Sequence, residues 1–291
     1  MNKLENNNLI IEIKNNGAEL TRIYSKSKNI DFLWNANNKY WGRHSPILFP
    51  IVGRLKDNET IINKNVYSMT QHGFARDMYF DLISQDENSL TYKLESNDTT
   101  KSKYPYEFEL IIKYTLNTSS INVSWQVKNK SNEAMYFSIG AHPAFNVPFD
   151  DDNDLSQYYL KLLSKNTINS YILEGPFVSK KTKINCLNNL DIKPELFKND
   201  AIIYDNINEV SICSKISNTS IKVNFKDFPF VGIWSPYYEE TNSIAPFICI
   251  EPWYGIADSV DSNKDFKTKL GINKLSIGEV FKASYEIEIC V

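Results

Sequence analysis

The sequence predicts an all-β protein in which many antiparallel strands pack as a large β-sandwich. Segments that alternate apolar and polar residues with a period of two recur along the chain, and they are rich in Ile, Val, Tyr and Phe. Few windows carry the apolar stripe that an amphipathic helix requires. Turn-forming residues separate the alternating segments, as short strands joined by tight connections require.

Six segments show the strand pattern most clearly, and the alternation predicts that one face of each turns to the core. They are LIIEIK (9–14), LTYKLES (90–96), YEFELIIKYTL (106–116), SINVSWQVKN (120–129), TSIKVNFKD (219–227) and VFKASYEIEIC (280–290). Turns are predicted at KDN (56–58), NKN (63–65), SND (96–98) and SNE (131–133). Neither a Pro/Gly/Ser-rich linker nor a fixed repeat divides the chain, so one domain over residues 1–291 is expected.

The composition excludes several classes of protein. Hydrophobic residues make up 42% of the 291 residues and aromatic residues 13%, which is enough for an extensive core. The formal net charge of -3 comes without a basic stripe, so nucleic acid is not an expected partner. The N-terminus has no apolar signal core, and no run approaches the roughly 20 apolar residues of a membrane span. We therefore expect a soluble, cytoplasmic monomer or homodimer that does not bind membranes.

No metal or other cofactor is expected. The cysteines at 186, 213, 249 and 290 show no CxxC or other ligand spacing, so reduced thiols are expected. The acidic run DDDND (150–154) lacks the central glycine of an EF-hand loop, and Lys161 stands where that loop needs a glutamate. The acidic run is therefore interpreted as a solvated loop.

The scarce residue types gather in four short segments. The chain has only four arginines, three histidines and ten glycines. These segments hold two of the arginines, two of the histidines and four of the glycines. The segments are PILFPIVGRL (46–55), QHGFARD (71–77), SIGAHPAFNVPF (138–149) and APFICIEPWYGIAD (245–258). Chemistry is best sought where such residues concentrate.

In the third segment, strand alternation predicts a small polar face that ends in a histidine. It places Tyr136, Ser138, Gly140 and His142 on one side and Met135, Phe137, Ile139 and Ala141 on the other. A cleft lined by the first face would give a ligand room at Gly140 and present it to His142, and Pro143 would end regular pairing. The alternative is a hydrogen-bonded histidine at a strand end with no functional role.

In the fourth segment a carboxylate follows an apolar run. Phe247, Cys249, Glu251 and Trp253 are predicted to share a face. Burial raises the pKa of a carboxyl towards neutrality, which suits a general base. Trp253 offers a flat surface on which the C–H face of a sugar can rest. The alternative is a surface glutamate where Pro252 stops the strand.

The first two segments carry basic residues. His72 and Arg76 flank Gly73 in a turn after the hairpin at NKN, and Arg54 follows Gly53. If the segments converge, two guanidinium groups can make forked hydrogen bonds to sugar hydroxyls or to a phosphate. The alternative is a loop with a structural arginine. Arg43 and His44, in YWGRHSP, are interpreted as structural or rim residues.

Together these segments resemble the aldose 1-epimerase (galactose mutarotase-like) superfamily, in particular its shorter branch with hexose-6-phosphate 1-epimerases and lactose-operon mutarotase-like proteins. The resemblance runs from GAEL (17–20) through FPIVGRL, QHGFARD and AHPAFNV to IEPWYGIAD. It implies a large antiparallel β-supersandwich with an open sugar-binding cleft. It also implies cofactor-free interconversion of the α and β anomers of a hexose or hexose 6-phosphate.

The resemblance also implies roles for single residues. Glu251 corresponds to the general base for the C1 hydroxyl, and His142 to the general acid for the ring oxygen. His72 is implied as a further catalytic residue that orients the sugar. Substrate-binding residues are implied at Arg54, Gln71, Arg76 and Trp253, with Arg76 a candidate for a 6-phosphate, and at Asp200, with Asp205 as the alternative.

The chain departs from the classical galactose mutarotase pattern. That pattern continues as E-T-Q after the catalytic glutamate and has an H-G-G loop, whereas this chain has Pro252 and Trp253 after Glu251 and a single Gly73 after His72. The sugar therefore stays open between free and phosphorylated hexoses. A non-catalytic sugar-binding or sensing protein on the same fold is the main alternative. A glycoside hydrolase is disfavoured because it needs a pair of carboxylates.

Overall fold

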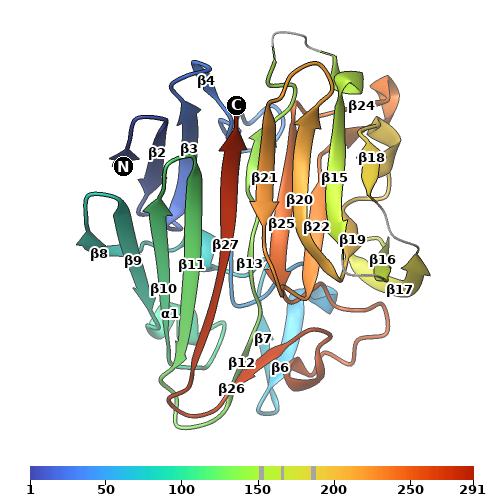
Figure 1. The fold of residues 1–291 in the computed structure, drawn as a ribbon. Helices are drawn as coiled ribbons and strands as arrows, with labels where there is room; N and C mark the ends of the chain where they lie inside the picture. Colours follow the sequence, from blue (N-terminus) through green and yellow to red (C-terminus); the bar gives the residue numbers. More distant parts are fainter. Residues whose placement is uncertain (151–153, 165–166, 185–187) are drawn as a thin grey trace.

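The computed structural model describes residues 1–150, 154–164, 167–184 and 188–291, and it shows the predicted all-β architecture (Figure 1). Every pairing between its named strands is antiparallel. The only α-helix among the described residues is α1 (Asp98–Lys101). Single 3-10 turns lie at Lys56–Asn58, Ala75–Asp77, Leu155–Gln157, Pro194–Phe197, Glu239–Thr241 and Phe266–Thr268. No helix of the described residues is long and apolar enough to cross a membrane.

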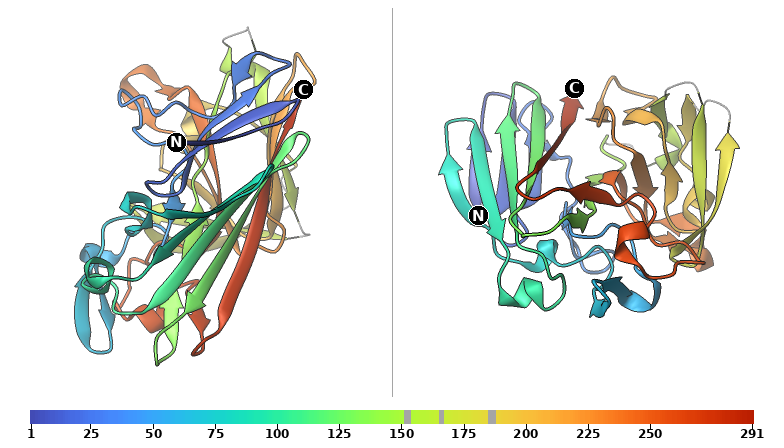
Figure 2. Two further views of the ribbon diagram at one scale, coloured as in Figure 1. Left: turned by 90° about the vertical axis from the view of Figure 1, so that its left-hand side faces the viewer. Right: turned by 90° about the horizontal axis from the view of Figure 1, so that it is seen from below.

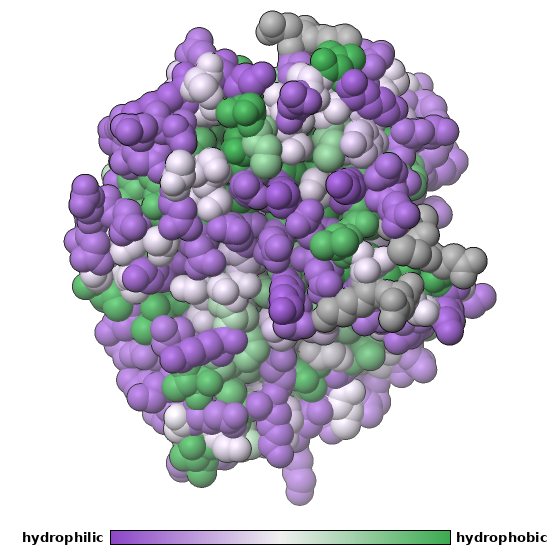
Figure 3. Space-filling model, in the orientation of Figure 1, coloured by the Kyte–Doolittle hydropathy of each residue, from purple (hydrophilic) through white to green (hydrophobic). Residues whose placement is uncertain are grey.

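The largest sheet has nine strands. In spatial order they are β18 (Asn189–Asp191), β15 (Tyr158–Ser164), β20 (Ile207–Ser214), β21 (Ser220–Asn224), β27 (Val280–Cys290), β11 (Ser120–Asn129), β10 (Phe108–Leu116), β9 (Ser89–Glu95) and β8 (Asp81–Gln85). Five of the six strands predicted from the sequence lie in this sheet. Its outer face is mainly hydrophilic (Figure 3). The left view of Figure 2 shows β27 on the side opposite the hairpin of β6 (Glu59–Ile62) and β7 (Asn65–Ser68).

The second sheet has eight strands and carries the residues of interest. Along its main path lie β17 (Phe177–Ile184), β16 (Ile168–Glu174), β19 (Ile202–Tyr204), β22 (Phe230–Trp234), β25 (Phe247–Tyr254), β13 (Ile139–Ala141) and β5 (Ile47–Leu48), and β14 (Ala144–Asn146) also pairs with β25. Residues of both sheets form one apolar core, with Ile233, Ile248 and Ile250 from this sheet meeting Val210 and Ile212 from the other. The two sheets therefore pack face to face.

Smaller sheets complete the fold. The N-terminal sheet contains β1 (Asn2–Glu5), β2 (Leu9–Lys14), β3 (Glu19–Ser25) and β4 (Ile30–Asp31), and two-stranded pairs are formed by β6 (Glu59–Ile62) with β7 (Asn65–Ser68), β12 (Met135–Phe137) with β26 (Asn273–Leu275), and β23 (Tyr237–Tyr238) with β24 (Ser243–Ile244). The strands β2, β11 and β27 have the predicted bounds. β21 is shorter than predicted, because a turn at Phe225–Phe228 follows it.

Two sequence expectations fall partly outside the described residues. Cys186 and residues 151–153 of the acidic run belong to the segments that are not described. Within the described part, Cys213, Cys249 and Cys290 are free thiols. Asp150 of the acidic run accepts hydrogen bonds from the hydroxyls of Tyr158 and Ser217.

Candidate active site

A cavity of about 280 Å³ lies on the face of the eight-stranded sheet that is turned away from the nine-stranded sheet. Its volume is close to the lower end of the roughly 300–1,000 Å³ of small-molecule sites. All eight residues selected from the sequence line it, namely Arg54, Gln71, His72, Arg76, His142, Asp200, Glu251 and Trp253. The rest of the wall is formed by Trp41, Gly53, Leu173, Pro176, Ala201, Ile203, Trp234 and Ala257.

His142 and Glu251 lie opposite each other across neighbouring strands. His142 falls at the break between β13 and β14, where Pro143 interrupts regular pairing as predicted. Two strand pairs bracket the break in one antiparallel register, Gly140 with Trp253 and Ala144 with Cys249. The midpoint of that register is His142 opposite Glu251. Cross-strand pairing thus brings together two residues that are far apart in the chain.

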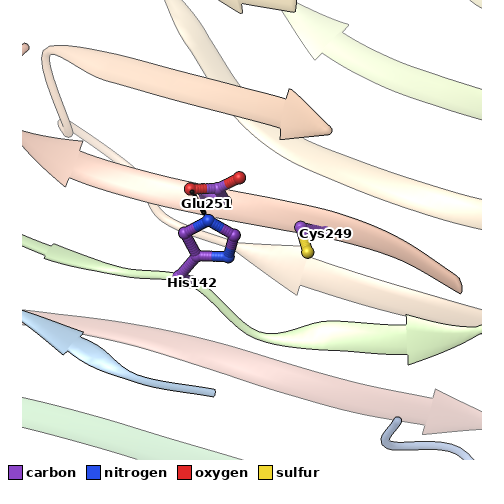
Figure 4. A group of neighbouring side chains, drawn as sticks. All are labelled: His142, Cys249 and Glu251. Carbon is purple, nitrogen blue, oxygen red and sulfur yellow. Dashed lines mark ion pairs between the residues drawn. The ribbon is translucent and has the colours of Figure 1, made fainter. Parts of the chain in front are cut away.

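These two side chains touch. Nε2 of His142 lies 3.2 Å from Oε2 of Glu251 (Figure 4), and both residues are buried. Burial lowers the pKa of His142 to about 3. Burial, helped by the negative charge of Asp200, raises the pKa of Glu251 well above its usual value. Burial therefore favours the neutral imidazole of His142 and the neutral carboxyl of Glu251, which is the arrangement that buries no net charge.

His72 joins the first two segments. Its backbone N–H donates to the carbonyl of Gly53 (2.8 Å), and the N–H of Gly53 donates back to Nδ1 of His72 (3.2 Å). An Nδ1 that accepts a hydrogen bond leaves the ring proton on Nε2. Burial, helped by the charges of His142 and Arg76, lowers the pKa of His72 well below its usual value. The ring is therefore neutral, with Nε2–H as its donor to a ligand.

Arginines concentrate beside the two histidines. Gln71 connects Arg54 and Arg76, because its side-chain oxygen accepts from Nη2 of Arg54 (3.3 Å) and its carbonyl from Nη2 of Arg76 (2.7 Å). Burial and the charge of Arg43 lower the pKa of Arg76 to about 10. Within the described part of the chain, the buried Nε atoms of Arg54 and Arg76 have no hydrogen-bond partner. An anionic or hydroxyl-rich ligand could satisfy both.

Trp253 lies flat on the sheet between two glycines. A Cβ at Gly140 would lie 2.6 Å from Cδ1 of Trp253, and one at Gly232 would lie 2.4 Å from the far edge of the same ring. Any side chain at either position would displace the indole. The two glycines therefore set the position of the ring, whose exposed face belongs to the cavity wall.

This arrangement corrects one sequence prediction. The space beside Gly140 holds the indole of Trp253 instead of a ligand, and Tyr136, Ser138 and Gly140 are not among the cavity-lining residues. The alternation itself is correct for the other face, because Met135 and Phe137 belong to the main core. The error has a physical cause: β12 pairs with β26 in a separate two-stranded sheet, so residues 135–142 do not form one continuous strand.

The cavity contains Asp200 and not its alternative. Burial raises the pKa of Asp200, although hydrogen bonds from Ala201 and Trp234 oppose the shift. Asp205 is turned to other partners, since it accepts from Asn169 and from the hydroxyl of Tyr171. Asp200 is thus a second carboxylate on the cavity, and it supplies the charge that acts on Glu251.

Sequence reasoning missed two tryptophans in the wall. Trp41 stacks on the imidazole of His142, with ring centroids 4.8 Å apart and planes 25° apart, and Trp234 meets the same ring edge-on at 5.7 Å. A usable signal existed for Trp41, because it stands two residues before Arg43 in YWGRHSP. Arg43 itself pairs with Asp77 at 2.7 Å. Nothing in the local pattern around Trp234 distinguishes it from a core aromatic.

One group of side chains has the composition of a metal site. Single ligand atoms of His142, Cys249 and Glu251 all lie within 4.8 Å of one another. The three residues are buried, and Cys249 is the neighbour of Glu251 on the same face of β25 (Figure 4).

Comparison with known proteins agrees with the fold and with the sequence motifs. The family model for aldose 1-epimerase matches residues 1–271. Protein LacX (chromosomal) of Lactococcus lactis subsp. lactis is 33% identical over 300 residues, covering 99% of this chain and 98% of its own.

Solved structures resemble the whole chain. A galactose mutarotase related enzyme from Lactobacillus acidophilus superposes with a TM-score of 0.94 at 34% identity, covering 100% of this chain and 97% of its own. A galactose mutarotase-like protein from Lactobacillus casei gives a TM-score of 0.92 at 31% identity, with 100% of both chains covered.

Proposed function

The chain belongs to the aldose 1-epimerase family, and from this premise we propose that it interconverts the α and β anomers of an aldohexose. The observation that carries the proposal is the 3.2 Å contact between His142 and Glu251 on the cavity wall. Anomerisation needs a base at the C1 hydroxyl and an acid at the ring oxygen together. A buried pair that shares one proton supplies both.

In the proposed reaction Glu251 is the base and His142 the acid. Transfer of the carboxyl proton from Glu251 to Nε2 of His142 across their contact prepares both groups, giving a carboxylate and an imidazolium. Glu251 then takes the proton of the C1 hydroxyl, and His142 gives its proton to the ring oxygen as the bond from C1 to that oxygen breaks. The pair thereby returns to its resting arrangement. After rotation about the C1–C2 bond, the same transfers in reverse close the ring as the other anomer.

The other cavity residues fit the binding of a pyranose. His72 offers a fixed N–H donor, Asp200 offers a carboxylate acceptor for hydroxyls, and Trp253 offers a flat surface for the C–H face of the ring. We assign them to binding and orientation, with His72 closest to the chemistry because its ring lies edge-on to His142 at 5.4 Å.

For the substrate we propose an aldohexose phosphate. The support is the pair Arg54 and Arg76, which line the cavity and whose buried Nε donors have no hydrogen-bond partner among the described residues. Desolvated guanidinium groups bind phosphate by charge-assisted, forked hydrogen bonds. Free sugar hydroxyls satisfy the same donors less well, because they carry no charge.

The anomerisation assay tests the reaction class. Freshly dissolved α-glucose, galactose and glucose 6-phosphate are followed by polarimetry or exchange NMR, and the protein is expected to accelerate equilibration of at least one of them. An absence of acceleration over buffer with every sugar would reject the proposal. Sugar binding measured by calorimetry, with turnover that Glu251→Gln leaves unchanged, would instead indicate a sugar-binding protein.

A second comparison tests the phosphate. Arg54→Ala and Arg76→Ala are expected to reduce kcat/KM for glucose 6-phosphate far more than for glucose. Arg22→Ala is the matched control, since Arg22 pairs with Asp31 and does not line the cavity. Equal losses on both sugars would reject phosphate recognition and leave the anomerase proposal standing.

A further inference from the structure

The proposed reaction leaves one reactive group of the site unused. Cys249 is a free thiol with 0% exposure, two residues before Glu251 on the same face of β25. Its cross-strand neighbour on β14 is Ala144, two residues beyond His142. The thiol therefore lies beside the acid and base pair, and it is not itself a lining residue of the cavity.

We propose that His142, Cys249 and Glu251 form a binding site for a thiophilic divalent cation such as Zn²⁺, and that the bound ion blocks anomerisation. The binding half of this inference rests on geometry alone. The inhibition half rests on the proposed function, since an ion held by His142 and Glu251 removes the proposed acid and base together.

The three side chains match Zn²⁺ in kind and in position. Imidazole nitrogen, thiolate sulfur and carboxylate oxygen are its usual ligands, and three protein ligands leave a fourth position open. Ligands at about 2.0–2.3 Å from one tetrahedral ion lie roughly 3.3–3.8 Å apart. The 3.2 Å between Nε2 of His142 and Oε2 of Glu251 is close to the lower end of this range. Cys249, within 4.8 Å, needs a shift of about an ångström.

The charge balance also favours a dication. A thiol and a carboxylic acid each lose a proton when they bind a metal, so two anionic ligands and a neutral imidazole leave no net charge around the ion. A hard cation such as Mg²⁺ prefers an all-oxygen environment and finds only one carboxylate in the group.

The carboxylate of Glu251 supplies a second observation. Within the described part of the chain, its buried Oε2 has no hydrogen-bond partner, and its one ion-pair contact is with Nε2 of His142 at 3.2 Å. Such an oxygen is costly in a protein interior, and coordination is one way to satisfy it. The cavity, which both residues line, gives an ion a path to the site from solvent.

Metal binding is tested directly with Co²⁺ and Zn²⁺ on the full chain. Co²⁺ is expected to give a thiolate charge-transfer band that Zn²⁺ abolishes, and calorimetry is expected to show one Zn²⁺ per site. Cys249→Ala is expected to remove the band and to weaken Zn²⁺ binding more than about tenfold. Cys290→Ala is the matched control, because Cys290 is a free, partly exposed thiol on the other sheet. Equal Zn²⁺ affinity in Cys249→Ala and in the unaltered protein would overturn the inference.

Inhibition is tested separately. Zn²⁺ is expected to stop anomerisation by the unaltered protein, EDTA to restore it, and Cys249→Ala to stay active at the same Zn²⁺ concentration. Binding without inhibition would overturn the second half of the inference while leaving the proposed function intact. If no sugar is anomerised at all, the Co²⁺ band still decides whether the metal site exists. Mg²⁺ in place of Zn²⁺ is expected to have no effect in either test.

Discussion

Glu19 and Glu251 are two glutamates with 1% exposure each, and their surroundings shift their pKa values in opposite directions. Burial raises the pKa of Glu19, but hydrogen bonds from His44 and the ion pair with Lys14 at 2.5 Å outweigh it, and the pKa falls to about 2. Glu251 contacts only His142 as an ion-pair partner in the described chain, and its pKa rises.

The comparison shows that burial alone does not set the direction in which the pKa of a carboxyl shifts. Oε1 of Glu19 accepts from the backbone N–H groups of His44 and Ser45, and Oε2 pairs with Lys14, so Glu19 is an anion that fixes a loop. That loop carries Trp41, which stacks on His142. Glu251 instead lines the cavity, with His142 as its ion-pair partner and with the charge of Asp200 raising its pKa, which is the setting expected of a proton-transfer group. We therefore infer a supporting role for the first glutamate and a reacting role for the second.

The largest expected effect is a difference in activity between variants of the two glutamates. Glu251→Gln should lower kcat by roughly 10²–10⁴-fold, the contribution of a general acid or base, whereas Glu19→Gln should stay within about tenfold of the unaltered protein. Steady-state anomerisation kinetics with EDTA present give both numbers. Comparable losses in the two variants would contradict the assignment of different roles.

The effects on stability should have the reverse order, with the larger loss in Glu19→Gln than in Glu251→Gln. Glu19→Gln removes charge-assisted hydrogen bonds and should lower the free energy of unfolding by about 1.5–3 kcal/mol. Glu251→Gln removes a carboxyl that prefers to be neutral in the fold, and should leave stability unchanged or raised. Urea unfolding at pH 7 measures both. A loss of stability in Glu251→Gln as large as that in Glu19→Gln would show that Glu251 is a structural anion.

The pH dependence of stability should have opposite signs. The lowered pKa of Glu19 means that its contribution is complete above about pH 4.5 and is lost as the pH falls towards 2. The raised pKa of Glu251 means that its contribution is complete below about pH 4.5 and is lost as the pH rises through the raised value. Relative to the unaltered protein, Glu251→Gln should therefore gain in Tm with rising pH, and the deficit of Glu19→Gln should shrink below pH 4.5.

The smallest expected effect tests whether Glu19 is coupled to the His142 and Glu251 pair through the loop that carries Trp41. Trp41→Ala removes the stack on His142, and a contact of about 0.5–1.5 kcal/mol corresponds to a loss of about 2- to 13-fold in kcat. Trp41→Phe should recover part of it. If Glu19 acts by holding Trp41 in place, the double variant should lose less than the product of the two single losses. If the loss in kcat of the double variant equals the product of the two single losses, Glu19 and Trp41 act independently.

The predictability of the strands depended on which faces of a sheet are buried. β11 alternates buried and more exposed residues along its length, and its bounds were predicted without error. Seven of the eight residues of β25 are buried, because Ile248 and Ile250 face the main core while Cys249 and Trp253 pack on the other side. A strand buried on both faces shows no alternation, so none of the six strands predicted from alternation belongs to the eight-stranded sheet, and its strand β25 was singled out only through its unusual segment.

The sequence by itself determined the all-β class, the strands with one exposed face, and the residue types of the site, because these depend on local periodicity and on scarce residues in short motifs. The tertiary structure decided which of them meet. Only strand register places His142 opposite Glu251, and only packing gives the space beside Gly140 to Trp253 and selects Asp200 for the cavity. Such contacts join residues distant in the chain, and local patterns do not encode them.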